Sequence, residues 1–366
     1  MTPARPVIAF HAPLKPPDAP TPSGDRRIAR LTLQALTEAG FAPRLASARR
    51  TLDLVGDPAR QAAAIDEAQD EADALAKAWR AAPPALWFTY HCYWKAPDLL
   101  GPRVAEALGI PYVISEPSLS PRRRAGPWAA YAAQAEAAIR AADLLLWSTP
   151  RDLPMLRAAG GLPLAQLPPF LDLGPPPPPG PPPGPLRLVA AAMMRPGDKL
   201  ASYRALAEAL SRLPQALDWR LDVAGDGAER SAVATLLATH RARIAFHGEL
   251  DPPALRALFE ASDLLAWPGV GEGIGMVYLE AQSAGLPCLA EDRPGPRHVI
   301  DPARALPPPN DPAAFAAALE AFAASDRPAA RRAARAHAVA HHGLPAAARR
   351  LTTLLTPLIG APVARP

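Results

Sequence analysis

The sequence predicts an α/β protein that contains two doubly wound parallel sheets, one in each half of the chain. Short apolar segments alternate with segments of helical periodicity in both halves. A proline-rich stretch, residues 174–185, separates the two series and can continue neither a helix nor a central strand. We therefore expect ligands to bind at the carboxyl ends of the strands in each sheet.

The first series of elements predicts an N-terminal α/β domain. A strand is expected at residues 6–10, and a helix at residues 24–38 follows Ser23, which is a favourable N-cap residue. The strongly apolar segment 85–90 predicts a central strand that delivers His91 at its end. The remaining expected elements are helices at 57–81 and 98–108, an alanine-rich helix that ends at Ala142, and strands at 110–114 and 144–147.

The second series begins after the prolines and predicts another sheet. Its first strand, residues 186–191, precedes a basic loop that contains Arg195 and Lys199. A later strand ends in the turn Gly225-Asp226-Gly227, and another ends at His247-Gly248. The other expected elements are a helix at 201–213, strands at 219–223, 244–246, 264–267 and 288–290, and helices from Pro312 onward.

These patterns predict two domains joined by a stiff connection. We expect an N-terminal domain at residues 1–173, an extended proline-rich linker at 174–185, and a C-terminal domain at 186–343. A final helix and tail, residues 344–366, complete the chain, and we expect this segment to cross back to the N-terminal domain. A length of 366 residues suffices for two cores of ordinary size.

Composition narrows the class of protein. Hydrophobic residues make up 49% and charged residues 20% of the chain, as in soluble globular proteins. The net charge of +4 is too small to indicate a nucleic-acid partner. The two cysteines, Cys92 and Cys288, favour a reduced protein. No run of eighteen apolar residues and no secretion signal is evident, so we expect a cytoplasmic location, with peripheral contact at the inner face of the membrane left open.

A glycine-rich segment near residue 270 is the most informative part of the sequence. An apolar strand enters it, and Glu272 and Glu280 flank the start of a predicted helix. The backbone N–H groups of Gly273, Ile274 and Gly275 lie between the two acids, at a helix N-terminus that favours an anion. Because the acids are roughly 12 Å apart along the helix, we expect them to hold the two ends of an extended ligand that carries a diphosphate.

The ordered set of these motifs resembles retaining glycosyltransferase family four, which has the GT-B fold of two Rossmann-like domains that face a central cleft. The resemblance rests on the basic loop, the Gly225-Asp226-Gly227 turn, the segment 247–250, the Glu-x7-Glu pattern of Glu272 and Glu280, and the helix end at residues 280–287. Similarity runs over nearly the whole chain but is looser in the N-terminal half. Leu200 departs from the family, which usually has glycine after the lysine.

The resemblance implies a nucleotide-sugar donor and assigns residues to its parts. Arg195 and Lys199 are expected at the diphosphate, Glu280 at the ribose hydroxyls, Glu272 near the donor sugar, and His91 at the active centre beside that sugar. The further residues expected to bind the donor, mainly through backbone groups, are Gly24, Gly248, Gly273, Ile274, Gly275 and Met276.

The acceptor side is less defined. Glu116 follows a strand in the N-terminal half and is expected to touch the acceptor, as is Arg26. The acceptor remains open between a polysaccharide, a lipid-linked sugar and a small molecule. Three consecutive arginines, residues 122–124, lie near Trp128 in sequence and suit an anionic membrane, a charged acceptor or simply solvent.

The resemblance implies a hexosyltransferase-type enzyme of surface polysaccharide or glycolipid synthesis that transfers a sugar with retained configuration. No metal or cofactor is expected, because the sequence offers no cluster of metal ligands and the nucleotide sugar is a substrate. A sugar-nucleotide epimerase of the same fold and a non-catalytic nucleotide-sugar-binding protein remain alternatives. A dinucleotide-dependent oxidoreductase is disfavoured because the first strand lacks a G-x-G-x-x-G loop.

Overall fold

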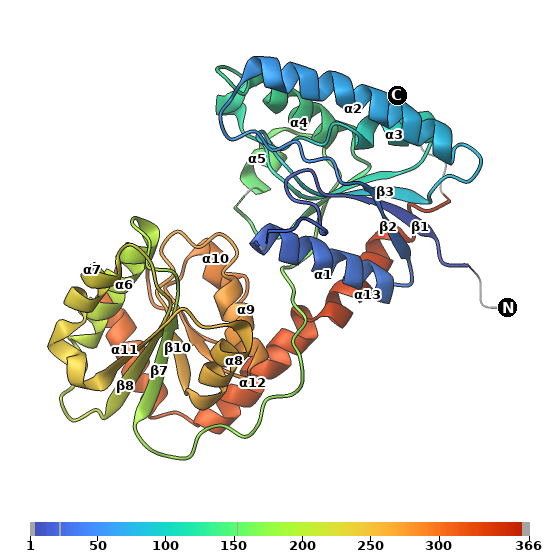
Figure 1. The fold of residues 1–366 in the computed structure, drawn as a ribbon. Coiled ribbons are helices and arrows are strands. Elements are labelled where there is room, and N and C mark those ends of the chain that lie inside the picture. The colour runs from blue at the N-terminus through green and yellow to red at the C-terminus, as the bar shows by residue number, and fades with distance from the viewer. Residues whose placement is uncertain (1–3, 22, 152, 361–366) are drawn as a thin grey trace. The chain divides into compact units, whose positions relative to one another are not determined.

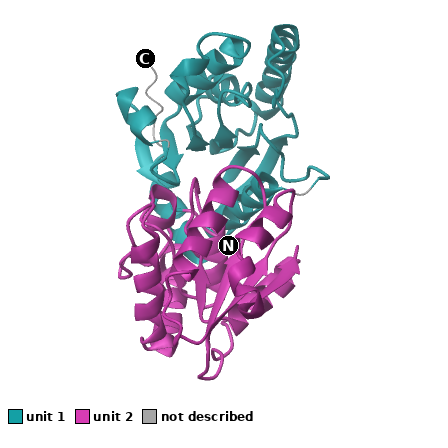
Figure 2. Cartoon of the chain, turned by 90° about the vertical axis from the view of Figure 1, so that its left-hand side faces the viewer, with its two compact units in different colours: residues 1–168, 344–366 teal, residues 169–343 magenta. Residues whose placement is uncertain are grey.

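Each half of the chain builds one parallel sheet with helices on its two faces (Figure 1). The computed structural model describes residues 4–21, 23–151 and 153–360. Two compact units divide the chain, as Figure 2 shows by colour: unit 1 contains residues 1–168 and 344–366, and unit 2 contains residues 169–343. The prediction of an α/β chain with two doubly wound sheets is confirmed.

Unit 1 contains a six-stranded sheet in the order β2-β1-β3-β4-β5-β6. The strands are β1 Val7–His11, β2 Ala42–Ser47, β3 Leu86–Cys92, β4 Tyr112–Pro117, β5 Leu144–Trp147 and β6 Leu164–Gln166. The helices are α1 Gly24–Glu38, α2 Pro58–Trp79, α3 Gly101–Leu108, α4 Ala129–Ala141, α5 Leu153–Ala158 and α13 Leu344–Leu355, with a short 3-10 turn, η1, at Pro121–Arg123.

Strand β3 is central in unit 1 because its side chains are almost entirely buried. Trp87 and Phe88 have no exposed surface, and the strand pairs with β1 on one side and with β4 on the other. Helix α1 begins where the Oγ of Ser23 accepts a hydrogen bond from the amide of Arg26, as its N-cap role predicts. The last helix, α13, packs against α1 and therefore belongs to unit 1.

Unit 2 contains a five-stranded sheet in the order β11-β10-β7-β8-β9. The strands are β7 Leu186–Ala191, β8 Trp219–Ala224, β9 Ile244–Gly248, β10 Leu264–Ala266 and β11 Cys288–Leu289. The helices are α6 Asp198–Leu210, α7 Arg230–Leu236, α8 Pro252–Ala261, α9 Met276–Ser283, α10 Pro294–Arg297, α11 Pro312–Ala323 and α12 Arg327–His341, and a 3-10 segment, η2, covers Ala238–Arg243.

The proline-rich segment lies within unit 2, whereas the sequence analysis set it apart as a linker between domains. The division between the units falls at residues 168 and 169, and again at residues 343 and 344. Arginines hold the carbonyls at both ends of the segment. Arg256 donates hydrogen bonds to Leu173 and Pro175, and Arg187 donates one to Pro182. Prolines donate no backbone hydrogen bond, so these guanidinium groups supply the donors that attach the segment.

Several short elements were missing from the sequence prediction. Strand β2 was not expected because it lies at the sheet edge, with four buried or half-buried positions interrupted by two exposed ones and a proline in its sequence APRLAS. Strand β6 is only three residues long and half-buried throughout. Helices α5, α7 and α8 are also short, with six, seven and ten residues. Such segments lack the length over which hydrophobic periodicity becomes readable.

Candidate functional site

The order of the strands marks one point in each sheet where a ligand is expected. In unit 2 the chain proceeds from β7 to β8 and β9 on one side, and then crosses to β10 and β11 on the other. In unit 1 it proceeds from β1 to β2, and then crosses to β3. Parallel sheets bind ligands at such topological switch points, outside the carboxyl ends of the strands. The residues predicted from the sequence to bind donor or acceptor are therefore described by their position relative to these two switch points.

In unit 2 the loops after β7 and β8 pack directly on each other. The amide of Met194 donates to the carbonyl of Asp226 at 2.8 Å, and that of Glu229 donates to Met194 at 2.9 Å. An added Cβ at Gly225 would lie 2.0 Å from the carbonyl oxygen of Ala192. The two glycines of the predicted Gly225-Asp226-Gly227 turn thus permit a close backbone approach at the strand ends.

Lys199, Glu272 and Trp267 form the central cluster at the switch point of unit 2. The Nζ of Lys199 forms a short ion pair with Oε1 of Glu272, and the indole Nε1 of Trp267 donates to the same oxygen at 3.0 Å. The Lys199 ammonium lies 5.7 Å from the centre of the Trp267 ring. Glu272 is 14% exposed and Lys199 is 27% exposed, so both charges face solvent only in part.

One detail of this cluster corrects the sequence analysis. Lys199 was expected in one loop with Arg195, but α6 begins at Asp198 and places Lys199 in its first turn. The N-cap residue is Gly197, which adopts a φ of +80°, so the helix begins three residues before the expected residue 201. Arg195 remains in the loop and is exposed. The side chains of Glu272 and Lys199, predicted near the donor sugar and the diphosphate, contact each other, and their roles toward the donor stay predictions.

The glycine-rich loop between β10 and α9 is held against α6. The amide of Val270 donates to Oγ of Ser202 at 2.9 Å. Gly271 has a φ of +66°, and an added Cβ there would lie 2.0 Å from Oδ2 of Asp198. Gly295 at α10 would likewise meet the carbonyl of Glu272 at 2.2 Å. Glycine is therefore required on both sides of this loop for the backbones to pack.

Helix α9 begins later than the sequence suggested. The start was expected near Ile274, but the helix begins at Met276, after Gly275 in the left-handed conformation with a φ of +76°. Gly273, Ile274 and Gly275 therefore belong to the loop immediately before the helix. Glu280 is the fifth residue of α9 and is half-buried, so it lies beyond the first turn whose N–H groups would face an anion.

Strand β9 is longer than the sequence predicted and contacts the neighbouring strand and loop. It continues to Gly248, two residues further than expected, and the Nε2 of His247 lies 2.6 Å from Oδ1 of Asp222 on β8. Gly248 has a φ of +69°, and its carbonyl accepts a hydrogen bond from the amide of Gly225 at 2.6 Å. The loops after β7, β8 and β9 are thus connected by backbone hydrogen bonds.

In unit 1, His91 lies at the switch point together with a residue that the sequence analysis did not single out. Its Nδ1 lies 3.2 Å from Oδ1 of Asp25, which is in the first turn of α1. The hydrogen bond from His91 lowers the pKa of Asp25 below its usual value. Gly24 opens the same helix and is exposed, while Nε of Arg26 is buried without a hydrogen-bond partner among the described residues.

His91 and Glu116 both adopt a backbone conformation that is uncommon for their residue types. Their φ angles are +62° and +55°. Register pairs Tyr90 with Ser115 and Cys92 with Pro117, so the two unusual residues lie opposite each other on β3 and β4. Non-glycine residues in the left-handed region cost of order 1 to 3 kcal/mol and concentrate at functional sites. This observation links Glu116 with His91 independently of any motif.

Two residues of the candidate sites escaped the sequence analysis. Trp267 was placed in the entering strand without a role, although it holds Glu272. The sequence feature that could have indicated its role is its position as the last residue of the apolar segment, directly before Pro268. Asp25 was noted only as part of the segment that contains Gly24. Its position two residues after the N-cap Ser23 is the available signal, because acidic residues favour the first turn of a helix.

The described residues contain no group of three or more His, Cys, Asp or Glu side chains arranged to hold a metal ion. Within the same residues, no helix combines the length and the apolar character that crossing a membrane requires. The polar groups at the two switch points are instead single pairs of a nitrogen base with a carboxylate, Lys199 with Glu272 and His91 with Asp25.

Part of unit 2 is similar to a known family. Residues 186–325 match the model described as glycosyl transferases group 1. A GDP-mannose-dependent alpha-mannosyltransferase of Mycolicibacterium smegmatis is 35% identical over 97 residues, which are 26% of this chain. The match covers only 25% of the length of that curated relative.

Solved structures resemble the chain over nearly its whole length. Sucrose-phosphate synthase from Thermosynechococcus elongatus is 19% identical with a TM-score of 0.65, covering 97% of this chain and 99% of that one. The Anabaena protein Alr3699/HepE in complex with UDP-glucose is 14% identical with a TM-score of 0.61, covering 96% and 100%. At these identities the likeness concerns the fold. Residues 186–325 are therefore similar to the group 1 glycosyl transferases, and the chain as a whole has the GT-B fold.

Proposed function

We propose that the protein transfers a hexosyl group from a nucleotide-sugar donor to an acceptor hydroxyl, with retention of configuration and without a metal ion. The observation that carries this proposal is the cluster of Lys199, Glu272 and the glycine-rich loop at the switch point of unit 2, inside the region that matches the family model. Relatives named for GDP-mannose and UDP-glucose support a nucleotide-sugar donor.

The diphosphate of the donor is proposed to bind Lys199, Arg195 and the backbone N–H groups before α9. Its charge would draw the Lys199 ammonium away from Glu272, because a diphosphate offers more negative charge than one carboxylate. Glu272 would keep its hydrogen bond from Trp267 and gain a free acceptor for sugar hydroxyls. The backbone groups proposed for donor binding are those of Gly24, Gly248, Gly273, Ile274, Gly275 and Met276.

Glu280 is proposed to accept hydrogen bonds from the ribose hydroxyls. His91 is proposed to contact the donor sugar, with Asp25 orienting its ring through Nδ1. Glu116 and Arg26 are proposed to contact the acceptor. These assignments make each of the side chains a target for substitution, and they predict that Glu280 affects donor affinity whereas Glu116 affects acceptor affinity.

The chemical step would be carried by the departing diphosphate. As the glycosidic bond to the diphosphate breaks, negative charge grows on the leaving oxygen, where Lys199 and Arg195 stabilise it. The acceptor oxygen bonds to the anomeric carbon on the face that the diphosphate leaves, and the leaving phosphate oxygen takes the acceptor proton. No enzyme carboxylate is assigned as a nucleophile in this scheme.

A donor screen tests the proposal. Thermal shifts with UDP-, GDP-, ADP- and TDP-sugars should show one donor that raises the melting temperature, since a ligand of the folded state stabilises it. Glu280→Ala should abolish that shift while the unliganded melting temperature stays unchanged. Incubation with acceptors and NMR of the product then reads the anomeric configuration. An inverted product would refute retention, and undiminished turnover in chelator would support metal independence.

Other functions of the same fold give different outcomes. A sugar-nucleotide epimerase would interconvert two nucleotide sugars in the absence of any acceptor. A non-catalytic binding protein would show a thermal shift with a donor and neither transfer nor slow donor hydrolysis. An oxidoreductase would bind NAD, so the absence of a shift with NAD would exclude it.

We further propose that unit 1 contacts an anionic membrane surface at the inner face of the membrane. The ring centres of Trp94 and Trp128 lie 5.3 Å apart in an edge-to-face arrangement. The guanidinium carbon of Arg123 lies 4.3 Å from the centre of the Trp94 ring. Beside them Leu54 and Val55 are 65% and 74% exposed. Exposed aliphatic residues, tryptophans and arginines together are typical of surfaces that insert at the level of lipid head groups.

Vesicle sedimentation tests this contact. Binding to vesicles with anionic lipid should exceed binding to neutral vesicles. Leu54→Ser with Val55→Ser, and separately Arg122→Glu with Arg123→Glu, should each weaken it about tenfold or more. Val339→Ser, which removes a side chain that is 49% exposed in unit 2, is the matched control. Equal vesicle binding by the two double variants and the Val339→Ser control would contradict the proposed membrane contact.

A further inference from the structure

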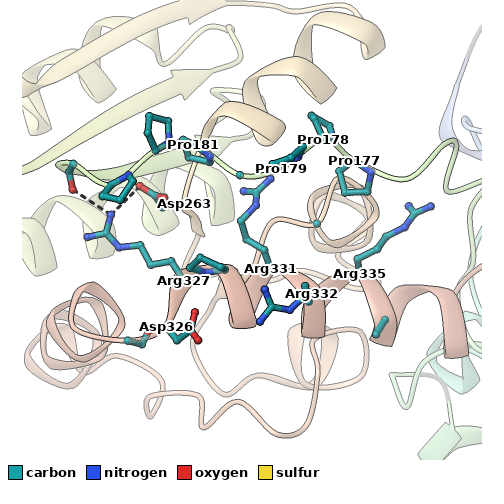
Figure 3. Close-up of a pocket in the computed structure, with 18 residues that line it drawn as sticks. Pro177, Pro178, Pro179, Pro181, Asp263, Asp326, Arg327, Arg331, Arg332 and Arg335 are labelled. Carbon is teal, nitrogen blue, oxygen red and sulfur yellow. Dashed lines mark hydrogen bonds and ion pairs between the residues drawn. The ribbon is translucent and has the colours of Figure 1, made fainter.

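A cavity of about 990 Å³ lies in unit 2 between the proline-rich segment and α12 (Figure 3). Prolines of residues 177–183 form one wall, and the opposite wall is α12, with Asp263 and Gly285 at the sides. None of the residues proposed above for donor binding lines this cavity. Its volume is in the range of pockets that bind small molecules, so we examined the chemistry of its walls.

The prolines of this wall offer carbon surface and no backbone hydrogen-bond donor, because proline lacks an N–H group. Arginine side chains hold the carbonyls near both ends of the segment, Arg256 and Arg335 at Pro175 and Gly174, and Arg187 and Arg327 at Pro182 and Gly184. At Gly180 an added Cβ would lie 2.6 Å from Nε of Arg331, which shows how closely the segment passes over that side chain. This wall therefore suits the apolar part of a ligand.

The helix wall is basic. Arg327, Arg331 and Arg335 recur every four residues and therefore lie on one face of α12, and Figure 3 shows their side chains directed from the helix toward the prolines. Arg332 lines the cavity as well and is exposed. Against these four arginines stand two aspartates, Asp263 and Asp326, so the lining has a formal excess of two positive charges.

Two of these arginines lack a carboxylate partner. Arg331 is only 7% exposed, and it donates to the carbonyls of Ser262 at 2.6 Å and Glu260 at 3.1 Å. Arg335 donates to the carbonyls of Leu173, Gly174 and Ser283. Within the described part of the chain neither forms an ion pair, whereas Arg327 lies 3.3 Å from Asp263. Burial accordingly lowers the pKa of Arg331 and of Arg335.

A desolvated guanidinium that has no carboxylate in direct contact is unfavourable, and an anion in the same cavity would offset that cost. We propose that the cavity binds an amphipathic anion. Its phosphate or carboxylate would meet Arg331, Arg332 and Arg335, and its apolar body would lie along the prolines. The site is separate from the proposed donor site, and the proposal does not depend on the glycosyltransferase activity.

The test uses the full chain and octyl phosphate, whose binding is followed by ³¹P NMR. Octyl phosphate should bind, octanol should not, and inorganic phosphate should bind about tenfold or more weakly because it lacks the apolar part. Lys199→Ala should leave octyl phosphate binding unchanged, since that residue belongs to the other site. Equal affinity for octanol, or loss of binding in Lys199→Ala, would overturn the proposal.

Two substitutions on α12 form a matched pair. Ala336→Trp fills the cavity that Ala336 lines and should abolish binding, while Ala333→Trp, at an exposed position of the same helix outside the lining, should leave it unchanged. Circular dichroism confirms that each variant is folded. If Ala336→Trp fails to fold, Arg332→Glu at an exposed position must weaken binding about tenfold or more, and unchanged binding would overturn the proposal.

A final arm identifies the source of the anion. Vesicles that contain phosphatidic acid replace octyl phosphate, and sedimentation is compared between the wild-type chain and Arg332→Glu. Retention that depends on Arg332 assigns the anion to a lipid head group. Binding of octyl phosphate without such retention assigns a free amphipathic metabolite. Binding of neither ligand refutes the site.

Discussion

The two switch points of the molecule use opposite means to expose polar groups at a strand edge. In unit 2 the positive φ angles at the strand ends belong to glycines, among them Gly225, Gly271 and Gly275. In unit 1 they belong to His91 and Glu116, which have side chains. The glycines allow backbones to approach each other and present N–H groups, whereas His91 and Glu116 present side chains at the expense of backbone strain.

The ion pairs at the two switch points also differ in the elements that they connect. Lys199 in the first turn of α6 is joined to Glu272 in the loop before α9, and the indole of Trp267 donates a hydrogen bond to the same carboxylate. His91 and Asp25 are joined between a strand end and a helix start. This difference underlies the proposal that unit 2 binds an anion through backbone and ammonium groups, whereas unit 1 contributes individual side chains.

The largest effect is expected at Lys199. Lys199→Ala should reduce transfer by about a hundredfold to a thousandfold, the loss that follows removal of one group that stabilises developing negative charge. Initial rates with the donor found in the screen measure it. Arg204→Ala, an exposed residue of the same helix α6, is the control and should retain wild-type rates. Equal rates in both variants would remove Lys199 from the site.

The next effect concerns the close backbone packing in unit 2. Gly225→Ala should lower the free energy of unfolding by about 2 to 5 kcal/mol, because the new Cβ meets the Ala192 carbonyl and the φ of +127° is unfavourable. Gly40→Ala has a φ of +92° with nothing within 4 Å and should cost only about 1 kcal/mol. Urea denaturation of both variants compares them, and similar losses would contradict the role of the close contact.

A smaller effect separates strain from chemistry in unit 1. His91→Gly should be more stable than His91→Ala by about 1 kcal/mol, because only glycine adopts a φ of +62° without strain. Both variants should lose transfer activity. Chemical denaturation and initial rates provide the two measurements. If the alanine variant were the more stable one, the backbone at His91 would not be strained.

The smallest effect is a change in pH dependence. The pKa of Asp25 is lowered in the folded protein by His91, so ionised Asp25 stabilises the fold above its unfolded pKa, near 3.8, and this contribution disappears as pH falls through the folded value. Asp25→Asn should therefore lose less stability than wild type between pH 4 and pH 2. Because Asp25 is 40% exposed, solvent keeps the difference small. Parallel acid-denaturation curves would disprove it.

The sequence predicted much of the fold and part of the candidate site. Alternation of apolar strands with amphipathic helices predicted both sheets apart from the short strands β2 and β6, and the positions of Lys199, Glu272 and His91 relative to the strand ends placed them at the edges where ligands are expected. The contacts that these side chains make could not be predicted from the sequence. The ion pair joins residues 73 positions apart, and the bond between His91 and Asp25 spans 66 positions.

By itself the sequence determined the secondary-structure classes, the glycines at tight turns and the residue types available for binding, because these depend on local sterics and hydrophobic periodicity. Tertiary structure alone decided which side chains meet, and it attached the proline-rich segment to unit 2 through Arg256 of α8 and Arg335 of α12. Such contacts arise from the packing of whole elements around a core. No local pattern encodes that packing, which is why the basic cavity beneath the prolines becomes visible only in the folded chain.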